Sequence, residues 1–333
     1  MICKDLMEEM ERILPSGQIL YDEPMERHCS FRTGGPADAL VLVRTEEELI
    51  KLMSLLKSCG EKYFLLGKGT NLLIGDGGYR GVIVTAAGAG LPEDRGKTAQ
   101  EGDQIQDGQS GEEGSLSVLD GIRVRGNRLT AGAGATLKAA ALAARDHGLT
   151  GLEFAAGIPG SVGGGLAMNA GAYGGEMKMA VRSVRLLMPD GSLCTKSTEE
   201  MGFGYRTSIL RTIPAVVLGA EFELEEGDRE AIRQRILELA AERRAKQPLN
   251  YPSAGSTFKR PEGYFAGKLI MDAGLRGYSV GGAQVSELHC GFVINRGDAT
   301  SAQVRQLIEE VQKKVYEDSG IMLEREVIFL GEF

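Results

Sequence analysis

The fold is indicated most clearly by residues 151–176, GLEFAAGIPGSVGGGLAMNAGAYGGE. Glycines at this density let the backbone approach a ligand closely, and main-chain amide groups can turn toward an anion. Within this run Ser161 adds a hydroxyl donor and Asn169 adds an amide, while the small residues after Asn169 leave room for a flat ligand. A glycine-rich turn between packed elements is the alternative interpretation on composition alone.

A second loop of the same character, GKGTNLLIGDGG, occupies residues 67–78, directly after residues 63–66, which are predicted to form a strand. Two such loops in one chain favour ligand binding over a simple turn. The dinucleotide fingerprint G-x-G-x-x-G fails here and again from Gly132, because Leu72 and Leu137 stand in place of its third glycine. A Rossmann site is therefore disfavoured.

Other catalytic motifs are missing from the sequence. It contains no G-x-x-x-x-G-K-[ST], no H-E-x-x-H and no G-x-S-x-G, which argues against the kinase, metalloprotease and α/β-hydrolase classes. The three histidines and the five cysteines are scattered, without C-x-x-C or zinc-like spacing. Neither a metal site nor a disulfide is predicted.

Composition sets further limits. With 333 residues, 42% of them hydrophobic, the chain can bury more than one core, and we expect two or three globular units. Its net charge of -8 opposes binding to nucleic acid or to an anionic membrane, so an anionic ligand needs a local basic pocket. No apolar run approaches the roughly 20 residues that span a bilayer, and the N-terminus predicts a charged amphipathic helix rather than a secretion signal. We expect a cytoplasmic protein without a nucleic-acid or membrane partner, and we infer no obligatory protein partner.

Strands and helices alternate along the chain without an obvious repeat. Thr45 and Glu48 predict a capping box that starts a helix before the strand at residues 63–66. A polar, aromatic-free stretch at residues 92–118 predicts a flexible surface insertion. Further strands, the last two joined by the turn Pro189-Asp190-Gly191, are predicted at residues 81–85, 128–131, 181–188 and 192–196.

The last third of the chain predicts a compact α/β unit. Asp228 can cap a helix that ends in the basic run at residues 243–246. Apolar residues at helical spacing between residues 304 and 315 predict an amphipathic helix, and residues 326–330 predict a final strand.

A third chemical constellation, NYPSAGSTFKRPEGYFAGKLI, occupies residues 250–270 and presents Ser256 on a small-residue turn. The nearby cations Lys259, Arg260 and Lys268 are candidates for the local anion site. A serine without a neighbouring histidine is a poor nucleophile, but it can pass a proton when nearby groups polarise it.

Six motifs, in order along the chain, resemble the UDP-N-acetylenolpyruvoylglucosamine reductase family. They are GKGTNLLIGDGG, EFAAGIPGSVGGGLAMNAGAYGGE, FGYRTSIL, YPSAGSTFKRPEGYFAGKLI, GGAQVSELHCGFVIN and LEREV, and the resemblance runs from residue 29 to residue 330 apart from the polar insertion. Only about fifty residues separate Arg206 from Ser256, so the chain resembles the family's shorter subgroup, which lacks a substrate-covering loop.

The resemblance implies an α+β fold with an FAD-binding domain of the vanillyl-alcohol-oxidase type, built from two subdomains, and a C-terminal α/β substrate domain. The expected boundaries are residues 1–28 for an N-terminal helical segment, 29–226 for the FAD-binding domain and 227–333 for the substrate domain. It also implies a two-step reaction in peptidoglycan precursor synthesis. NADPH reduces bound FAD, and the flavin then reduces UDP-N-acetylglucosamine enolpyruvate to UDP-N-acetylmuramate.

Hydride addition to an enolpyruvyl group pushes negative charge onto the adjoining carboxylate, so a fixed cation and an acid should face the resulting enolate. The resemblance assigns these roles to Arg206 and Glu326, and it assigns the role of proton donor to Ser256. Strand alternation would place Glu324 and Glu326 on the same face, so only the family motif selects Glu326.

Tyr205, Lys246 and His289 match family positions near the substrate, and the predicted anion site adds Lys259. Many family members have asparagine at the position of Arg260, and some have glutamine at that of His289, so hydrogen bonds to the substrate are expected to differ in detail. The predicted cofactor-binding residues lie in the glycine-rich segments and are Gly67, Lys68, Gly69, Thr70, Asn71, Leu72, Gly134, Gly157, Ile158, Pro159, Gly160, Ser161, Val162, Gly163, Gly164, Asn169, Ala170, Gly171 and Ala172.

Two alternative classes share part of this pattern. Another FAD-dependent oxidoreductase of the same cofactor fold, acting on an alcohol or a sugar, would keep the glycine loops but has no reason to keep Arg206, Ser256 and Glu326 together. A non-catalytic nucleotide-sugar-binding protein would not depend on Ser256 at all.

Overall fold

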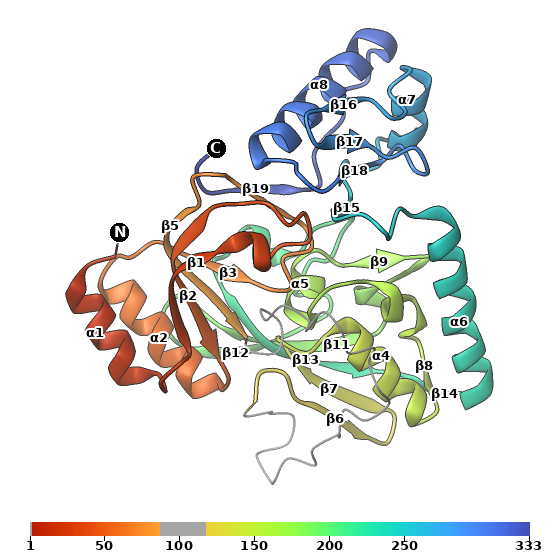
Figure 1. Cartoon of the computed structure of the whole chain (residues 1–333). Coiled ribbons are helices and arrows are strands. Elements are labelled where there is room, and N and C mark those ends of the chain that lie inside the picture. The colour runs from red at the N-terminus through yellow and green to blue at the C-terminus, as the bar shows by residue number, and fades with distance from the viewer. Residues whose placement is uncertain (1, 87–117) are drawn as a thin grey trace.

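The computed structural model describes residues 2–86 and 118–333 of the chain (Figure 1). Three larger sheets and the helices packed on them organise these residues, which confirms the predicted α+β fold. The predicted polar insertion at residues 92–118 lies outside the described residues except for Val118.

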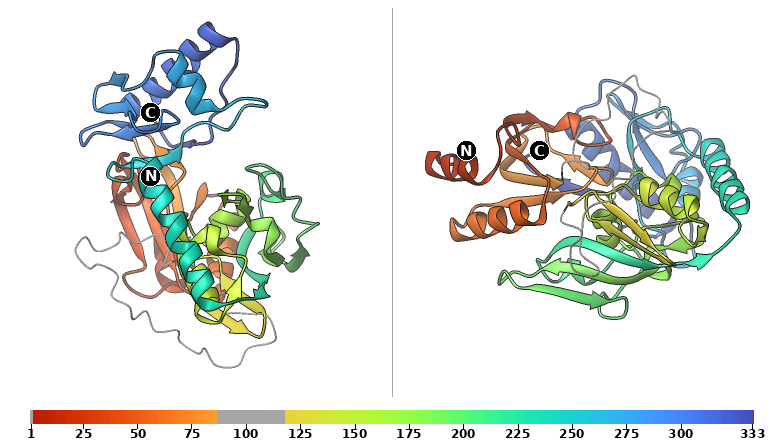
Figure 2. Two further views of the ribbon diagram at one scale, coloured as in Figure 1. Left: turned by 90° about the vertical axis from the view of Figure 1, so that its right-hand side faces the viewer. Right: turned by 90° about the horizontal axis from the view of Figure 1, so that it is seen from below.

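The first sheet is mixed. Its strands, in spatial order, are β1 (Ile19–Pro24), β2 (Pro36–Val43), β5 (Tyr79–Ala86) and β3 (Tyr63–Leu66). Strand β1 is antiparallel to β2, and β5 runs parallel to both β2 and β3. Helices α1 (Lys4–Ile13) and α2 (Glu46–Ser58) lie side by side against one face of this sheet (Figure 2). The predicted capping box of Thr45 and Glu48 is present at the start of α2.

The N-terminal segment differs from the prediction. Helix α1 ends at Ile13, and residues 19–24 form a strand of the first sheet rather than part of a helical segment reaching residue 28. This strand was not predictable from its sequence, because Asp22 and Pro24 are poor strand formers. Asp22 also adopts a φ of 50°, which is not a strand conformation. The first unit therefore includes residues before the predicted boundary.

The second sheet is antiparallel. Its strands, in spatial order, are β12 (Leu193–Ser197), β11 (Val181–Leu187), β13 (Val216–Glu223), β7 (Arg128–Gly132) and β6 (Ile122–Arg125). Helices α4 (Leu137–Asp146) and α5 (Val162–Ala167) share a buried core with this sheet. The predicted turn joins β11 and β12, where Gly191 adopts a φ of 88° and the Asp190 side chain accepts a hydrogen bond from Ser192 N.

Helix α6 (Arg229–Lys246) leads from the second sheet to the C-terminal unit, and it begins where the Asp228 side chain accepts a hydrogen bond from Ala231 N, as predicted (Figure 1). The C-terminal sheet consists of β15 (Ser253–Ser256), β18 (Phe292–Asn295), β17 (Ala283–Val285) and β16 (Ser279–Val280). Helices α7 (Ala266–Asp272) and α8 (Ser301–Ser319) accompany it, and the predicted apolar face of α8 is buried. None of the described helices is both long and apolar enough to cross a membrane.

The last strand leaves the C-terminal unit. Strand β19 (Ile328–Leu330) is shorter than the predicted strand at residues 326–330, and it pairs in parallel with β4 (Leu72–Ile74), next to the second glycine loop. Buried residues of β4 and of α8 belong to one continuous hydrophobic core. The C-terminal unit is therefore packed into the first unit rather than standing apart from it.

Candidate active site

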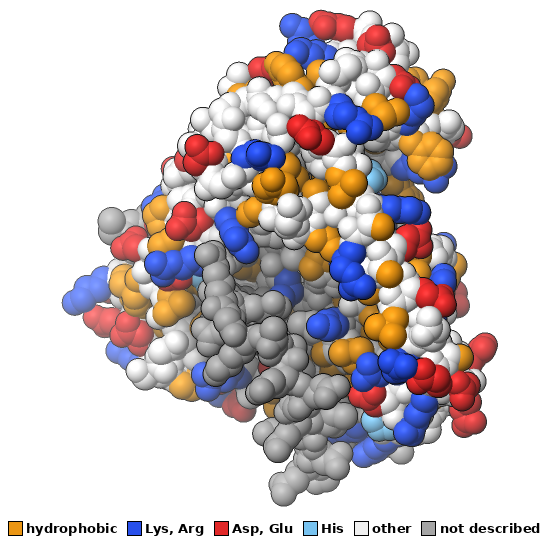
Figure 3. Space-filling model, turned by 45° about the vertical axis from the view of Figure 1, so that its right-hand side comes forward, with side chains coloured by type: hydrophobic (Ala, Val, Ile, Leu, Met, Phe, Trp, Pro, Cys, Tyr) orange, Lys and Arg blue, Asp and Glu red, His pale blue; other side chains and the backbone are white. Residues whose placement is uncertain are grey.

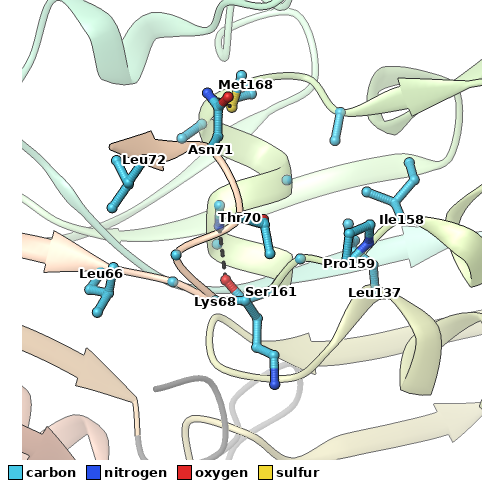
Figure 4. Close-up of a pocket in the computed structure, with 18 of the residues that line it drawn as sticks. Leu66, Lys68, Thr70, Asn71, Leu72, Leu137, Ile158, Pro159, Ser161 and Met168 are labelled. Atoms are coloured by element: carbon cyan, nitrogen blue, oxygen red, sulfur yellow. Dashed lines mark hydrogen bonds between the residues drawn. The ribbon is translucent and has the colours of Figure 1, made fainter. Parts of the chain in front are cut away.

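A cavity of about 720 Å³ lies where the three units meet. Both glycine-rich segments line it, together with Arg206, Ser256 and Glu326. Figure 4 shows the second glycine loop crossing in front of helix α5, with Asn71 beside Met168 at one end and Lys68 pointing away from them at the other. The structure thus brings together segments that lie far apart in the sequence.

The packing of the two loops explains why glycine is needed. Gly69 adopts a φ of 62°, and a Cβ atom on it would lie 2.0 Å from the carbonyl oxygen of His28. A Cβ atom on Gly67 would lie 2.6 Å from Ser161 Oγ. The loops therefore form a narrow cradle in which a flat or anionic ligand can approach the main chain.

The predicted cofactor residues line the cavity with two exceptions, Val162 and Asn169. Val162 is the first residue of α5, its side chain is buried in the core of the second sheet, and its amide donates to Ala135 O over 2.8 Å. The next two amides of α5 are also used within the protein, since Gly163 N donates to Ala133 O and Gly164 N donates to Ser161 Oγ. The expectation that these amides turn toward an anion is wrong for this turn.

The side chain of Asn169 forms hydrogen bonds within the protein. Its side chain is buried and donates to Glu176 Oε2 over 2.7 Å and to the Gly204 carbonyl over 3.0 Å, while its Oδ1 accepts from Lys178 N. These bonds use the whole amide group and fix the turn at Gly204 that carries Arg206.

Arg206 and Glu326 form the centre of the site. Arg206 Nε donates to Glu326 Oε1 over 2.7 Å, and the two side chains are only 24% and 12% exposed. Arg206 adopts a φ of 56° in a turn whose flanking residues Gly204 and Thr207 pair with each other. A non-glycine residue in this conformation is held there by its surroundings. The turn directs the guanidinium toward a residue 120 positions later in the chain.

Glu326 and Glu324 differ in burial, and this difference distinguishes the two residues, which sequence spacing could not do. Glu324 is 71% exposed and pairs with Lys259 over 2.7 Å, whereas Glu326 lies in the cavity wall. Both residues precede β19, so strand alternation does not apply to them. Burial raises the pKa of Glu326, and the nearby Arg206 only partly offsets this effect.

The four predicted substrate-binding residues, Tyr205, Lys246, Lys259 and His289, are not among those that line the cavity. The Tyr205 side chain is 55% exposed and its hydroxyl accepts a hydrogen bond from Arg260 N, while Lys246 pairs with Glu242 over 2.5 Å. Lys259 is held by Glu324. His289 is half-buried and its pKa is lowered by burial. Lys268, another cation of the predicted anion site, forms an ion pair with Asp272.

Arg243 and Arg211 are cavity cations that sequence reasoning missed, and Arg243 is the more informative of the two. It lies on α6 and lines the cavity with Tyr173 and Gln247, and its Nε donates to Gln247 Oε1 over 2.9 Å. Burial lowers its pKa, and no carboxylate in the described part of the chain forms an ion pair with it. Helix periodicity could have identified it, because Arg243 follows the buried Leu239 by four residues and so lies on the same face. On the face of the molecule shown in Figure 3, Lys and Arg side chains gather around a hollow.

The fold and the site define the chain as a flavoprotein. A family model for an FAD binding domain matches residues 107–197, and the cradle of glycines fits a flat cofactor with a pyrophosphate. Among residues 2–86 and 118–333, no group of His, Cys, Asp and Glu could hold a metal ion.

A second family model, described as the C-terminal domain of UDP-N-acetylenolpyruvoylglucosamine reductase, matches residues 247–330. Enzymes of that name from Clostridioides difficile (strain 630) and Agathobacter rectalis are 46% and 48% identical to this chain, covering 99% and 96% of it and the same shares of their own lengths. The crystal structure of the UDP-N-acetylenolpyruvylglucosamine reductase from Thermus caldophilus is 31% identical, with a TM-score of 0.71, and the match covers 94% of this chain and 98% of that one. The chain belongs to the UDP-N-acetylenolpyruvoylglucosamine reductase family.

Proposed function

We propose that this chain reduces UDP-N-acetylglucosamine enolpyruvate to UDP-N-acetylmuramate, at the expense of NADPH and with bound FAD, as a step of peptidoglycan precursor synthesis. The observation that carries the proposal is the partly buried pair of Arg206 and Glu326, which lines the same cavity as Ser256 and both glycine loops. When bound, FAD supplies the redox chemistry by accepting a hydride from NADPH and delivering one to the enolpyruvyl group.

The cradle formed by residues 67–72 and 157–164 would hold the FAD pyrophosphate. Its glycines place main chain rather than side chain at the ligand surface, and Lys68 and Thr70 add polar side chains to the same wall. Because the cradle and Glu326 line the same cavity, the cofactor and the substrate carboxylate would occupy neighbouring parts of it.

Arg206 would stabilise the enolate that forms as the hydride is added. Its guanidinium is fixed by Glu326 and by a long contact of 3.4 Å from Nη2 to the Gly171 carbonyl, so it needs no rearrangement as charge develops. Planar guanidinium groups match carboxylates, which suits an enolate derived from a carboxylate.

Glu326 would act as the acid beside this cation. Burial raises its pKa and so widens the pH range in which the carboxyl group is protonated, and in that form it can donate a hydrogen bond to the enolate oxygen. Ser256, at the end of β15, would give its proton to the neighbouring carbon and so complete the reduction. Lys259, which pairs with Glu324 and is not among the cavity-lining residues, would act on the site only through its charge, which partly offsets the raised pKa of Glu326.

Arg243 would recognise the diphosphate of the nucleotide sugar. Its Nε donates to Gln247, and since no carboxylate in the described residues pairs with it, the remaining N–H groups of the guanidinium would be available for a phosphate group. This assignment replaces Lys246, one turn further along α6, whose charge is already balanced by Glu242.

One anaerobic experiment tests cofactor, donor and acceptor together. Purified protein should be yellow, NADPH should bleach the flavin absorbance, and the enolpyruvyl nucleotide should then restore it. Colourless protein would count against FAD, and bleaching without recovery would favour an oxidoreductase that acts on another acceptor. The boundary between the FAD-binding and substrate domains, the shorter subgroup and the cytoplasmic location stay predictions.

A further inference from the structure

The backbone of Glu326 is held from two sides, although it belongs to no strand. Its amide donates to the carbonyl of Thr257 over 2.9 Å, which ties it to the segment that follows Ser256. Its carbonyl accepts a hydrogen bond of 3.0 Å from Asn71 Nδ2, which ties it to the second glycine loop. These two hydrogen bonds fix the backbone of Glu326, and the hydrogen bond from Arg206 fixes its carboxylate group.

We infer that Asn71 is a positioning residue that couples the cofactor loop to Glu326, and this inference rests on the proposed function. The side chain of Asn71 bonds to the Glu326 carbonyl, while its own carbonyl accepts a hydrogen bond of 3.0 Å from Ile328 N. One residue of the loop thus contacts the chain on both sides of Val327. A shift of the loop must therefore move the Glu326 backbone with it.

The side chain of Asn71 is committed to this role rather than to the cofactor. A side-chain amide has two N–H donors, and Nδ2 of Asn71 directs one toward Glu326 and the other toward Met168 Sδ, 3.3 Å away. Figure 4 shows this side chain beside Met168, at the far end of the loop from Lys68. The sequence assigned Asn71 to cofactor binding, and the geometry assigns its amide to Glu326.

The coupling has a consequence for the order of events. A pyrophosphate bound in the glycine cradle would hold residues 67–71 in place, and through Asn71 it would also hold the backbone of Glu326, whose carboxylate meets Arg206 over 2.7 Å. Loss of the coupling should impair the step that uses Glu326 and leave the reduction of the flavin by NADPH intact.

The test uses holoenzyme in which Asn71→Ala removes the amide and Asn71→Leu replaces it with an apolar side chain of similar size. Asn127→Ala, in an exposed turn, is the matched control. We expect FAD content and the rate of NADPH-dependent bleaching to stay close to wild type in all three. Reoxidation by the enolpyruvyl nucleotide should slow roughly 10- to 100-fold in both Asn71 variants with little change in KM, because the acid is displaced rather than removed.

Hydrogen exchange of the peptide containing residues 326–330, measured without substrate, provides a second readout. Both Asn71 variants should exchange faster there than wild type or Asn127→Ala. Unchanged reoxidation in both variants would overturn the inference, and so would loss of FAD from both, which would make Asn71 a cofactor ligand. If wild-type protein itself is not reoxidised, the proposed function fails instead, while the exchange experiment still tests the coupling.

Discussion

Replacing Gly69 by alanine would test the cofactor cradle most directly. Gly69 has a φ of 62°, a conformation that costs an L-residue about 1–2 kcal/mol. The new Cβ atom would also lie 2.0 Å from the His28 carbonyl oxygen, whereas ordinary contacts begin at 3.4 Å, so the loop must move by about 1.4 Å. Such a shift would strain the hydrogen bond of 3.0 Å from Ser30 N to Gly69 O, which holds the loop in place.

The expected result is a folded protein that has lost most of its FAD. The assay compares flavin absorbance per protein after purification, and then the dissociation constant of added FAD by flavin fluorescence. Gly126→Ala is the matched control, because Gly126 has nearly the same φ, 57°, but has no atom within 4 Å of the added Cβ. The control should lose thermal stability through backbone strain and keep its FAD.

The two variants separate strain from displacement of the loop. If Gly69→Ala retains wild-type flavin content and affinity, the loop at residues 67–72 does not hold the pyrophosphate. If both variants lose FAD equally, general destabilisation is the cause, and the geometry of the cradle is not the deciding factor.

Three further predictions concern the reacting groups. Ser256→Ala should leave NADPH-dependent bleaching unchanged and slow reoxidation by the enolpyruvyl nucleotide by about 10²–10⁴-fold in stopped-flow traces, and equal reoxidation rates would refute its role as proton donor. Because burial raises the pKa of Glu326, this carboxyl group destabilises the fold least below its ordinary pKa of 4.5, and its contribution to stability should fall as the pH rises through the raised pKa. The stability difference between wild type and Glu326→Gln should therefore follow this pH dependence. The reoxidation rate of wild type should decline above the same pKa, and this decline should be absent in Glu326→Gln. Arg243→Met should raise the KM for the nucleotide sugar with little change in kcat, and Arg244→Met, which alters an exposed position, should change neither.

Local signals in the sequence predicted local structure well. The capping box of α2, the cap of α6, the apolar face of α8 and the turn after β11 all depend on residues within a few positions of each other, and the structure confirms each. Both predicted glycine loops line the cavity, because a high density of glycines indicates close approach of the main chain to another group, whatever that group is.

Contacts between distant segments were not predictable in the same way. The parallel pairing of Leu72 with Ile328 joins positions at opposite ends of the chain, and no residue in either strand specifies that partner. The pairing of β1 was not predictable either, because its sequence shows no alternation of apolar and polar residues. Nor was the hydrogen bond of Asn169, whose side-chain amide donates to a turn 35 residues away. The family resemblance supplied Arg206 and Glu326, and the structure supplied the reason why they meet.

The sequence does show which of the candidate cations have a carboxylate neighbour on the same helix. Lys246 has Glu242 four positions before it, and Lys268 has Asp272 four positions after it, so on a helix each finds a neighbouring carboxylate and its charge is balanced there. The positions three and four away from Arg243 carry Leu, Ala, Lys and Gln, so no such partner exists for it. A cation on the partly buried face of a helix, without an acid at these spacings, has no carboxylate on its own helix to balance its charge. Applied to α6, this argument favours Arg243 over Lys246 as the residue proposed to bind the diphosphate.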